Sequence, residues 1–306
     1  MLLTISIALN LILLYMLFGK DNPKLSIKED GQEHPFLSKR IFTEDQNEYI
    51  INLNPLRKAL RAYVQNSGKK IQLYFEYLPS GSSIGINHQE DFVAASLFKV
   101  PVAMAVMKQI SEGKLNENRI LTVEEKHIDN RFGTLWKKGP GTKITVSEAI
   151  KASLMQSDNT AANLLQDSIP PSSLADVFQS LDFPSISENE AQTYVSVKNY
   201  SSIFRSLYLS SYLSRQSSNE ILNILTQTIF NDKIAALPTK DIKVAHKIGV
   251  LNSVNSNETI YTDCGIVYVP NRPYILCVFA KESEEKAGEH MRFISNLAYS
   301  YMIAVK

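Results

Sequence analysis

Ser96 and Lys99 form a Ser-x-x-Lys pair where an apolar helix is expected to begin. Residues three apart share one face of a helix, so the hydroxyl and the amine can meet. A serine hydroxyl becomes a strong nucleophile only when a neighbouring group takes its proton. Burial lowers the pKa of a lysine, because desolvation disfavours the charged amine, and this would suit Lys99 to that task. The spacing therefore predicts nucleophilic catalysis by a serine assisted by a lysine.

The same spacing occurs at three other places, so the spacing alone does not select Ser96. Those three pairs lie among Gly, Glu and Lys, which favours a solvated surface: Ser67/Lys70, Ser111/Lys114 and Ser283/Lys286. Ser96 instead has apolar neighbours on both sides, among them Phe92, Val93, Leu97, Phe98, Val100 and Val102. Burying a charge without a partner is costly, so a buried serine and lysine indicate a function.

Two later motifs strengthen the case for Ser96. Ser157-Asp158-Asn159 occurs once in the chain and is also a good helix N-cap. Lys247-Ile248-Gly249 fits Lys-x-Gly, a pattern also present at Lys137/Gly139 and Lys286/Gly288. Chance readily supplies any one of these pieces. It much less readily supplies all three in this order, each on the kind of element its chemistry needs.

The elements that must position these motifs can be predicted from periodicity. Alternation predicts strands at 71–77 and 83–87 and again at 243–250, 259–269 and 274–280. Helical spacing precedes the first group, fills much of the sequence between the two groups and returns after them; helices are expected near 56–64, 96–112, 145–156, 157–169, 172–181, 196–209, 217–230 and 283–304. The fold class is therefore α+β. One antiparallel sheet of N- and C-terminal strands is covered by helices and lies beside an all-helical subdomain.

The three motifs resemble the set found in class A β-lactamases and penicillin-binding proteins. The likeness continues through Ser157 to Leu165, the lead-in at 145–150 and the loop at 132–141, and covers about residues 52–304. It implies a β-lactamase/transpeptidase-like fold and a serine hydrolase that needs no cofactor. Its substrate would be the amide of a β-lactam or of a D-Ala-D-Ala-type cell-wall peptide.

The resemblance also implies a role for each motif residue. Ser96 would be the acylated nucleophile, and Lys99 its proton acceptor or relay. Ser157 would pass a proton to the leaving nitrogen. Asn159 would hold Lys99 and the substrate amide, and Lys247 would face the substrate carboxylate. Past Gly249, the backbone N–H of Val250 would complete an oxyanion hole with that of Ser96.

Two departures from the family pattern affect the expected activity. Ile248 replaces the usual threonine or serine, which removes a hydroxyl worth roughly 1.5–3 kcal/mol to a bound carboxylate. The segment between the Ser157 helix and the helix near Ser196 is short and lacks Glu-x-x-Leu-Asn, which carries the deacylating glutamate in the family. Glu188 and Glu190 lie in this segment. A solvated acidic loop is the favoured interpretation of these two residues, with a role in deacylation as the alternative.

Composition limits the other function classes. A net charge of +1 without a basic block gives no support for nucleic-acid binding. The five histidines form no i,i+4 pair, so no metal site is predicted. A hairpin about Asn271-Arg272 would place Cys264 opposite Phe279 and diagonal to Cys277. Diagonal pairs lie roughly 7–8 Å apart, so two buried thiols are favoured over a disulfide.

The N-terminal region differs in composition from the rest. Residues 2–18 are uncharged and almost wholly apolar, which predicts a membrane anchor at 1–18. No small-x-small cleavage site follows, so an uncleaved anchor is favoured over a signal peptide. Residues 19–50 would be a polar tether and 51–306 the catalytic domain. Lysines after residue 19 favour a cytoplasmic domain by the positive-inside rule, but the substrates expected from the resemblance favour an extracytoplasmic one.

Two functions remain open on the sequence. The first is a hydrolase, either a β-lactamase or a D,D-peptidase, with slow deacylation. The second is a membrane-tethered penicillin-binding or sensor domain that is acylated without efficient turnover. The intact set of Ser96, Lys99, Ser157, Asn159 and Lys247 argues against an inactive relative, because nothing structural requires all five.

Overall fold

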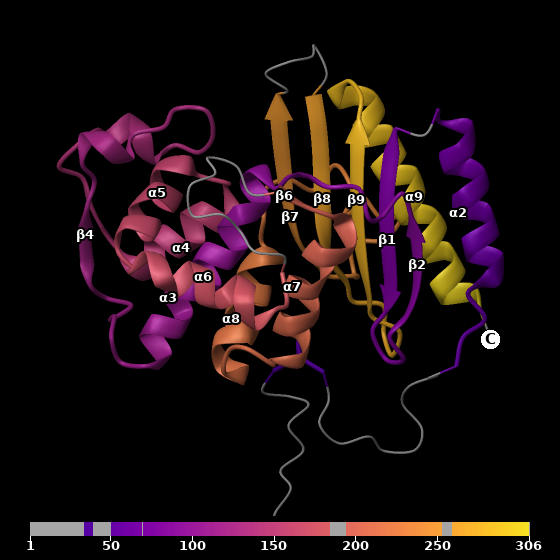
Figure 1. Cartoon of the computed structure of the whole chain (residues 1–306), viewed down its shortest axis with the longest axis horizontal. Helices are drawn as coiled ribbons and strands as arrows, with labels where there is room; N and C mark the ends of the chain where they lie inside the picture. Colours follow the sequence, from indigo (N-terminus) through magenta and orange to yellow (C-terminus); the bar gives the residue numbers. More distant parts are fainter. Residues whose placement is uncertain (1–33, 39–49, 69, 184–193, 253–258, 306) are drawn as a thin grey trace, which may run out of the picture. The chain divides into compact units, whose positions relative to one another are not determined.

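Two groups of strands that are far apart in sequence meet in one antiparallel sheet (Figure 1). The computed structural model describes residues 34–38, 50–68, 70–183, 194–252 and 259–305. The five-stranded sheet has the order β2-β1-β9-β8-β7, which places β7 at an edge. Its strands are β1 (Ile71–Tyr77), β2 (Ser82–Ile86), β7 (Val244–Asn252), β8 (Thr259–Val267) and β9 (Tyr274–Lys281). The predicted sheet is therefore confirmed.

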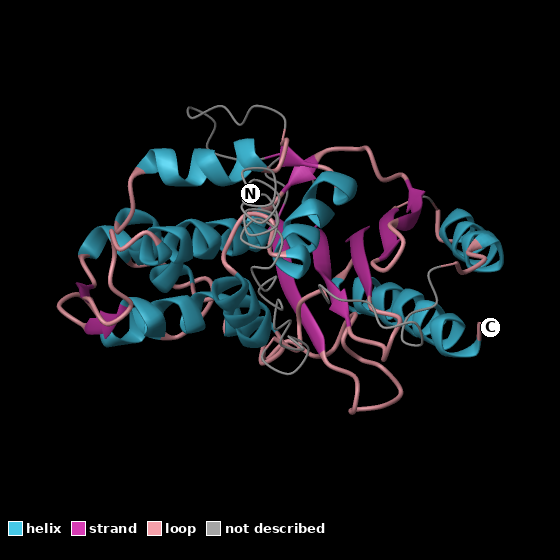
Figure 2. Cartoon of the chain, turned by 90° about the horizontal axis from the view of Figure 1, so that it is seen from below, coloured by secondary structure: helices cyan, strands magenta, loops and turns pink. Residues whose placement is uncertain are grey.

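Helices cover both faces of the sheet, because alternating strand residues are apolar on both sides. One face packs against α2 (Asn54–Asn66) and α9 (Glu284–Ala304), seen on the right of Figure 1. The other face packs against the helical part of the molecule, with α7 (Val197–Leu209) in contact with β1, β8 and β9. Figure 2 shows the same layers from below.

The helical part is built around α3 (Lys99–Ser111). Residues 99 to 107 of this helix are all buried, so α3 has neighbours on every side. These neighbours are α4 (Val146–Met155), α5 (Asn159–Asp167), α6 (Pro171–Ser180) and α8 (Arg215–Leu225). The predicted all-helical subdomain is thus present, and the helix that follows Ser96 is its central element.

Several short elements lie where the sequence gives no periodic signal. Two-residue β3 (Phe92–Val93) pairs with β6 (Tyr194–Val195), and β4 (Ile120–Thr122) pairs with β5 (Lys143–Thr145). Three turns of 3-10 helix lie among them: η1 (Ala95–Phe98), η2 (Glu125–His127) and η3 (Leu135–Lys138). Segments of two to four residues are too short to show either periodicity, and β4, η2 and η3 accordingly lie in a stretch for which the sequence predicted neither helix nor strand.

The prediction for the cysteines is wrong. Cys264 lies directly opposite Cys277 in the β8–β9 ladder, with Cα atoms 4.0 Å apart, and the two form a disulfide. The turn is centred one residue earlier than the sequence suggested, since Val267 pairs with Tyr274. A shift of the centre by one residue moves every cross-strand partner by two, which turns a diagonal pair into a direct one.

Residues 34–38, assigned to the tether, contact the catalytic domain. Leu37 is buried, the ring of Phe36 meets Tyr268 edge-on at 5.2 Å, and Ser38 N donates to Tyr208 O at 2.8 Å. The predicted anchor at 1–18 lies outside the described residues. Within the described ranges, no helix combines the length and apolarity that a membrane span requires.

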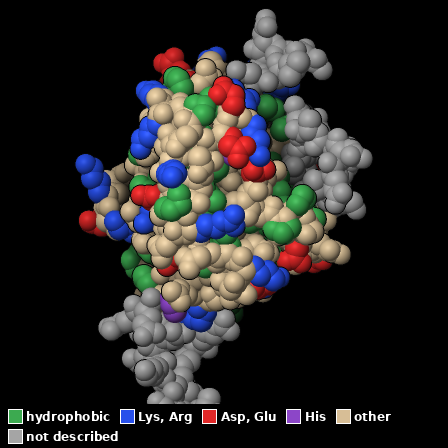
Figure 3. Space-filling model, turned by 90° about the vertical axis from the view of Figure 1, so that its left-hand side faces the viewer, with side chains coloured by type: hydrophobic (Ala, Val, Ile, Leu, Met, Phe, Trp, Pro, Cys, Tyr) green, Lys and Arg blue, Asp and Glu red, His purple; other side chains and the backbone are tan. Residues whose placement is uncertain are grey.

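On the face at the helical end, basic and acidic side chains are interspersed (Figure 3).

Candidate active site

Ser96 lies in η1, one turn before α3 begins. Ala95 has φ of +47°, a left-handed conformation that costs an L-residue about 1–2 kcal/mol. Packing holds this bend in place, because the buried Tyr200 of α7 donates its hydroxyl to Leu97 O at 2.8 Å. The Ser96 side chain is half-buried. The bend therefore presents the hydroxyl at the rim of the helical core instead of inside it.

Lys99 contacts two groups that the sequence predicted for it. Its Nζ lies 2.8 Å from Ser96 Oγ and 2.7 Å from Asn159 Oδ1. The residue is 6% exposed, and burial lowers its pKa from 10.5 to about 8. The Asp158 carboxylate opposes this shift. Near neutral pH part of Lys99 is therefore neutral, and a neutral amine can accept the Ser96 proton.

Ser157 stands at a second left-handed bend, with φ of +54°, immediately before α5. The next residue, Asp158, caps that helix by accepting Ala161 N at 2.9 Å. Its other oxygen accepts Thr134 N at 2.6 Å and Leu135 N at 2.8 Å. One buried carboxylate thus joins the loop before η3 to the helix that carries Asn159.

Gly133 is required by this junction. It has φ of +85°, and a Cβ atom at this position would lie 2.1 Å from Asp158 Oδ2. Any other residue would have to displace the capping carboxylate. Gly133 is thus part of the support for Ser157 and Asn159, although it belongs to none of the three motifs.

Lys247 reaches Ser157 from the edge strand β7. Its Nζ donates to Ser157 Oγ at 2.8 Å and to Ile248 O at 2.9 Å. The side chain is fully buried, and desolvation lowers its pKa well below 10.5. The positive charge of Lys99 lowers it further, whereas Asp263 raises it. The structure therefore brings the second and third motifs together.

The strand β7 passes close to the Ser96 turn at Gly249. A Cβ on Gly249 would lie 2.4 Å from Thr262 Oγ1 and 3.5 Å from Ala94 O. The Thr262 hydroxyl of β8 therefore leaves no room for a side chain at Gly249, whereas the Ser96 turn would be only in ordinary contact with a Cβ. Val250 follows on the same strand, so its backbone and that of Ser96 belong to two segments that converge at this point.

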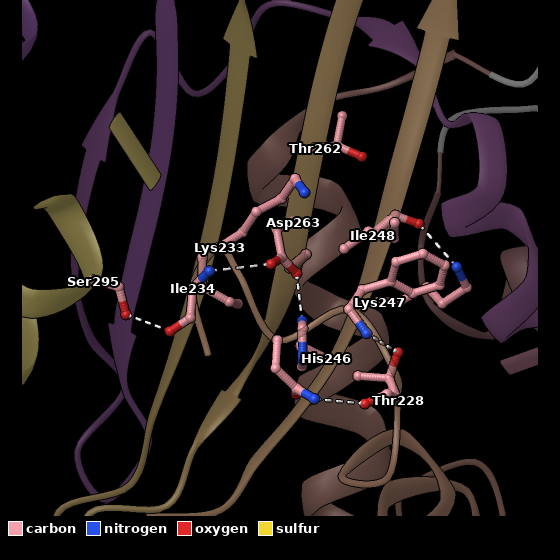
Figure 4. A network of polar contacts seen from close by, with 12 residues as sticks. Thr228, Lys233, Ile234, His246, Lys247, Ile248, Thr262, Asp263 and Ser295 are labelled. Carbon is pink, nitrogen blue, oxygen red and sulfur yellow. Dashed lines mark hydrogen bonds and ion pairs between the residues drawn. The ribbon is translucent and has the colours of Figure 1, made fainter. Parts of the chain in front are cut away.

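A buried polar cluster that none of the three sequence motifs includes joins β7 to β8 and to Ile234. Asp263 Oδ1 lies 2.8 Å from His246 Nδ1, and Oδ2 accepts Ile234 N at 3.2 Å (Figure 4). Ser295 of α9 donates to Ile234 O at 2.6 Å. Both His246 and Asp263 are fully buried. The alternation of Ile260 to Ile266 contains one acidic residue, Asp263, which is the sequence signal that could have found this cluster.

Some predicted features lie elsewhere. Ile248 is buried, as its apolar side chain favours, and offers no hydroxyl. Glu188 and Glu190 lie outside the described residues. Among the residues that the structure describes, no three His, Cys, Asp or Glu side chains gather as metal ligands.

The family model described as "Beta-lactamase enzyme family" matches residues 55–302, which is most of the chain and contains all three motifs. The chain belongs to the beta-lactamase enzyme family. It is a β-lactamase-like serine hydrolase of the class A type.

Relatives of this beta-lactamase family member are distant in sequence. The extended-spectrum β-lactamase PER-1 of Pseudomonas aeruginosa is 28% identical over 232 residues, covering 70% of this chain and 75% of PER-1. A β-lactamase of Phocaeicola vulgatus is 24% identical over 247 residues, covering 72% and 77%. Among solved structures, a mutant of PBP-A in an acyl-enzyme complex with penicillin G has a TM-score of 0.73 and 25% identity, covering 82% of this chain and 97% of that one.

Proposed function

We propose that Ser96 forms an acyl-enzyme with the amide of a β-lactam or of a D-Ala-D-Ala-type cell-wall peptide. The contact of Lys99 Nζ with Ser96 Oγ at 2.8 Å and with Asn159 Oδ1 at 2.7 Å carries this proposal. It places a buried amine of lowered pKa against a half-buried serine, which is the arrangement that an activated nucleophile requires.

Each step of the acylation can be assigned to a residue. Neutral Lys99 takes the Ser96 proton while Oγ attacks the carbonyl carbon. The developing oxyanion accepts hydrogen bonds from the backbone N–H groups of Ser96 and Val250. The C–N bond then breaks. Ser157 gives its proton to the leaving nitrogen, and Lys247, 2.8 Å from its oxygen, replaces that proton. The products are an ester on Ser96 and an amine, which leaves when the substrate is a peptide and stays attached to the ester when it is a β-lactam.

We further infer that deacylation is slower than acylation. The segment that carries the deacylating glutamate in related enzymes lacks Glu-x-x-Leu-Asn here. Without a carboxylate to activate water, an ester on Ser96 persists. This favours a D,D-peptidase or a penicillin-binding protein over an efficient β-lactamase. A membrane-tethered sensor that reports acylation is the second candidate, and the same observation supports it.

The catalytic domain is proposed to face the outside of the cytoplasmic membrane. Cell-wall peptides and β-lactams are met there. The disulfide between Cys264 and Cys277 supports this location, since disulfides persist in oxidising compartments. Protease treatment of intact cells tests it: a domain that stays protected until the cells are lysed contradicts the proposal.

Labelling with penicillin tests the function directly. The full chain, kept in mild detergent because residues 2–18 are apolar, is incubated with a fluorescent penicillin and, separately, with a chromogenic cephalosporin. We expect a stable label on Ser96, found by mass spectrometry, with little colour change. Fast colour change would instead identify an efficient β-lactamase. Wild type that labels no more than Ser96→Ala would rule out acyl-enzyme formation with β-lactams.

A further inference from the structure

The loop that follows η2 is fastened to α5, the helix that carries Asn159. Asp129 N donates to Thr160 Oγ1 at 3.0 Å, and that hydroxyl lies 3.2 Å from Asp129 O. One turn further along the helix, Asn163 Nδ2 donates to His127 O at 3.1 Å. Thr160 is fully buried, so these contacts are shielded from water. The backbone of Asp129 is therefore fixed relative to Asn159.

The Asp129 carboxylate points at the Asn159 amide. Asn159 Nδ2 donates to Asp129 Oδ1 at 3.0 Å. Arg131 binds both oxygens of the same carboxylate, with Nε at 3.1 Å from Oδ1 and 3.0 Å from Oδ2. The carboxylate is 14% exposed, whereas the Arg131 side chain is 78% exposed. Asp129 thus lies between an active-site amide and an arginine at the surface.

This contact decides which way the Asn159 amide faces. An asparagine side chain has an acceptor oxygen on one side and a donor nitrogen on the other. A flipped amide would turn its oxygen toward the Asp129 carboxylate and its nitrogen toward Lys99 Nζ, so both contacts would become repulsive. With Asp129 ionised, only the orientation with Oδ1 toward Lys99 satisfies both neighbours.

We propose that Asp129 is a positioning residue of this site. It fixes the orientation of the Asn159 amide and places a negative charge on the opposite side of that amide from the Lys99 amine. The proposal rests on the function proposed above. None of the three sequence motifs contains Asp129, and its action on the reaction runs through Asn159 and Lys99. It is a positioning residue because it needs no contact with substrate.

The charges around Lys99 predict in which direction its pKa changes when one of them is removed. Three charged groups act on Lys99: Asp129 and Asp158 raise its pKa, whereas Arg131 lowers it. Hydrogen bonds from Arg131 and Asn159 hold the pKa of Asp129 well below its usual range, so the carboxylate stays ionised wherever the enzyme works. Removing the charge of Asp129 lowers the pKa of Lys99, and removing the charge of Arg131 raises it.

Two substitutions with opposite effects test the proposal. The second-order rate constant for labelling by penicillin is measured from pH 6 to 10. Asp129→Asn keeps an acceptor oxygen for Asn159 but loses the charge, so the rising limb of the profile should shift to lower pH by about half to one unit. Arg131→Gln should shift the limb to higher pH by a smaller amount. Asp129→Glu should restore the wild-type position.

A matched control excludes a general effect of surface charge. Glu112 pairs with Lys114 at 2.7 Å at the far end of α3, and Glu112→Gln should leave the profile unmoved. A limb that stays in place in Asp129→Asn, or that moves the same way in Asp129→Asn and Arg131→Gln, overturns the proposal. If Asp129→Asn does not fold, Arg131→Gln decides alone, because an upward shift supports the proposal and any other result contradicts it.

A second readout separates this proposal from the proposed function. In protein labelled with 13C at the lysine ε-carbon, the Lys99 resonance is assigned by its loss in Lys99→Arg and titrated in each variant. Its midpoint should fall in Asp129→Asn and rise in Arg131→Gln, whether or not penicillin reacts. Absent labelling with shifted midpoints contradicts only the function, whereas labelling with unshifted midpoints contradicts only the role of Asp129.

Discussion

The Ser96–Lys99 pair and the Ser157–Lys247 pair have the same 2.8 Å contact but different surroundings. Lys99 begins a helix and lies near the Asp129 and Asp158 carboxylates. Lys247 is fully buried on an edge strand and donates to the Ser157 hydroxyl and to the Ile248 carbonyl, with Asp263 supplying the opposing charge. Burial lowers both pKa values, and the positive charge of Lys99 lowers the pKa of Lys247 further.

In the proposed mechanism, this difference suits the two lysines to different tasks. Lys99 has a pKa of about 8 and adjoins the half-buried serine, so it can exchange a proton with the nucleophile near neutral pH. A substrate carboxylate beside Lys247 would favour the charged form of that lysine. Repulsion from charged Lys247 would then favour neutral Lys99, so we expect charge to couple substrate binding to activation of Ser96.

Replacing Lys99 should break the first pair with the largest effect. Lys99→Met keeps the length and apolar packing of the side chain but removes the base, so labelling by penicillin should slow by about 10³-fold. The rate constant for labelling is measured at pH 8, with thermal unfolding as the control for folding. A loss of less than tenfold would assign the base to another group.

Replacing Lys247 should break the second pair with a smaller effect. Lys247→Met removes the proton source for Ser157 and the charge for a substrate carboxylate, so labelling should slow by about 10²-fold. The loss should appear mainly as weaker binding for a carboxylate-bearing β-lactam, because Ser96 and Lys99 remain intact. Equal losses for a substrate and for its methyl ester would contradict a role in carboxylate binding.

The pH profile of the wild type sharpens the comparison. The reactive form of Lys99 is neutral, and its pKa is lowered from 10.5 to about 8. Labelling should therefore rise by about tenfold per pH unit up to pH 7 and level off above pH 8. A rise that continues to pH 10 would show that burial does not lower the pKa of Lys99 in solution.

Restoring the missing hydroxyl should have the smallest effect. Ile248→Thr adds a donor for a substrate carboxylate, and labelling by penicillin should increase by about tenfold. The matched control is Ile248→Val, which has the shape of threonine without its hydroxyl. Equal rates for these two variants would show that the hydroxyl does not reach the substrate.

Long elements and the motif residues could be predicted from the sequence. The strands β1, β7, β8 and β9 and the helices α4, α5 and α9 carry strong periodicity, and Ser96, Lys99, Ser157, Asn159 and Lys247 are brought together as expected. Three motifs in a fixed order selected one Ser-x-x-Lys pair out of four. The family, and with it the fold, followed from that selection.

Contacts that depend on register or on unpatterned loops could not be predicted. The Cys264–Cys277 disulfide depended on the centre of one turn, which Pro270 to Pro273 did not specify. Asp129 lies in a segment without periodicity, so nothing in the sequence placed it against Asn159. The apolar alternation around Asp263 predicted a strand but not the contacts of its carboxylate with His246 and Ile234. Such contacts join segments distant in sequence, and only the folded chain reveals them.

Gly133 has a consequence for how genomes are searched for enzymes of this kind. One added methyl group there would meet the Asp158 carboxylate at 2.1 Å, although every letter of the three motifs would be unchanged. A search by motif would count such a chain as active. Backbone positions that leave room for a supporting side chain such as Asp158 therefore belong in the signature beside the residues that do the chemistry.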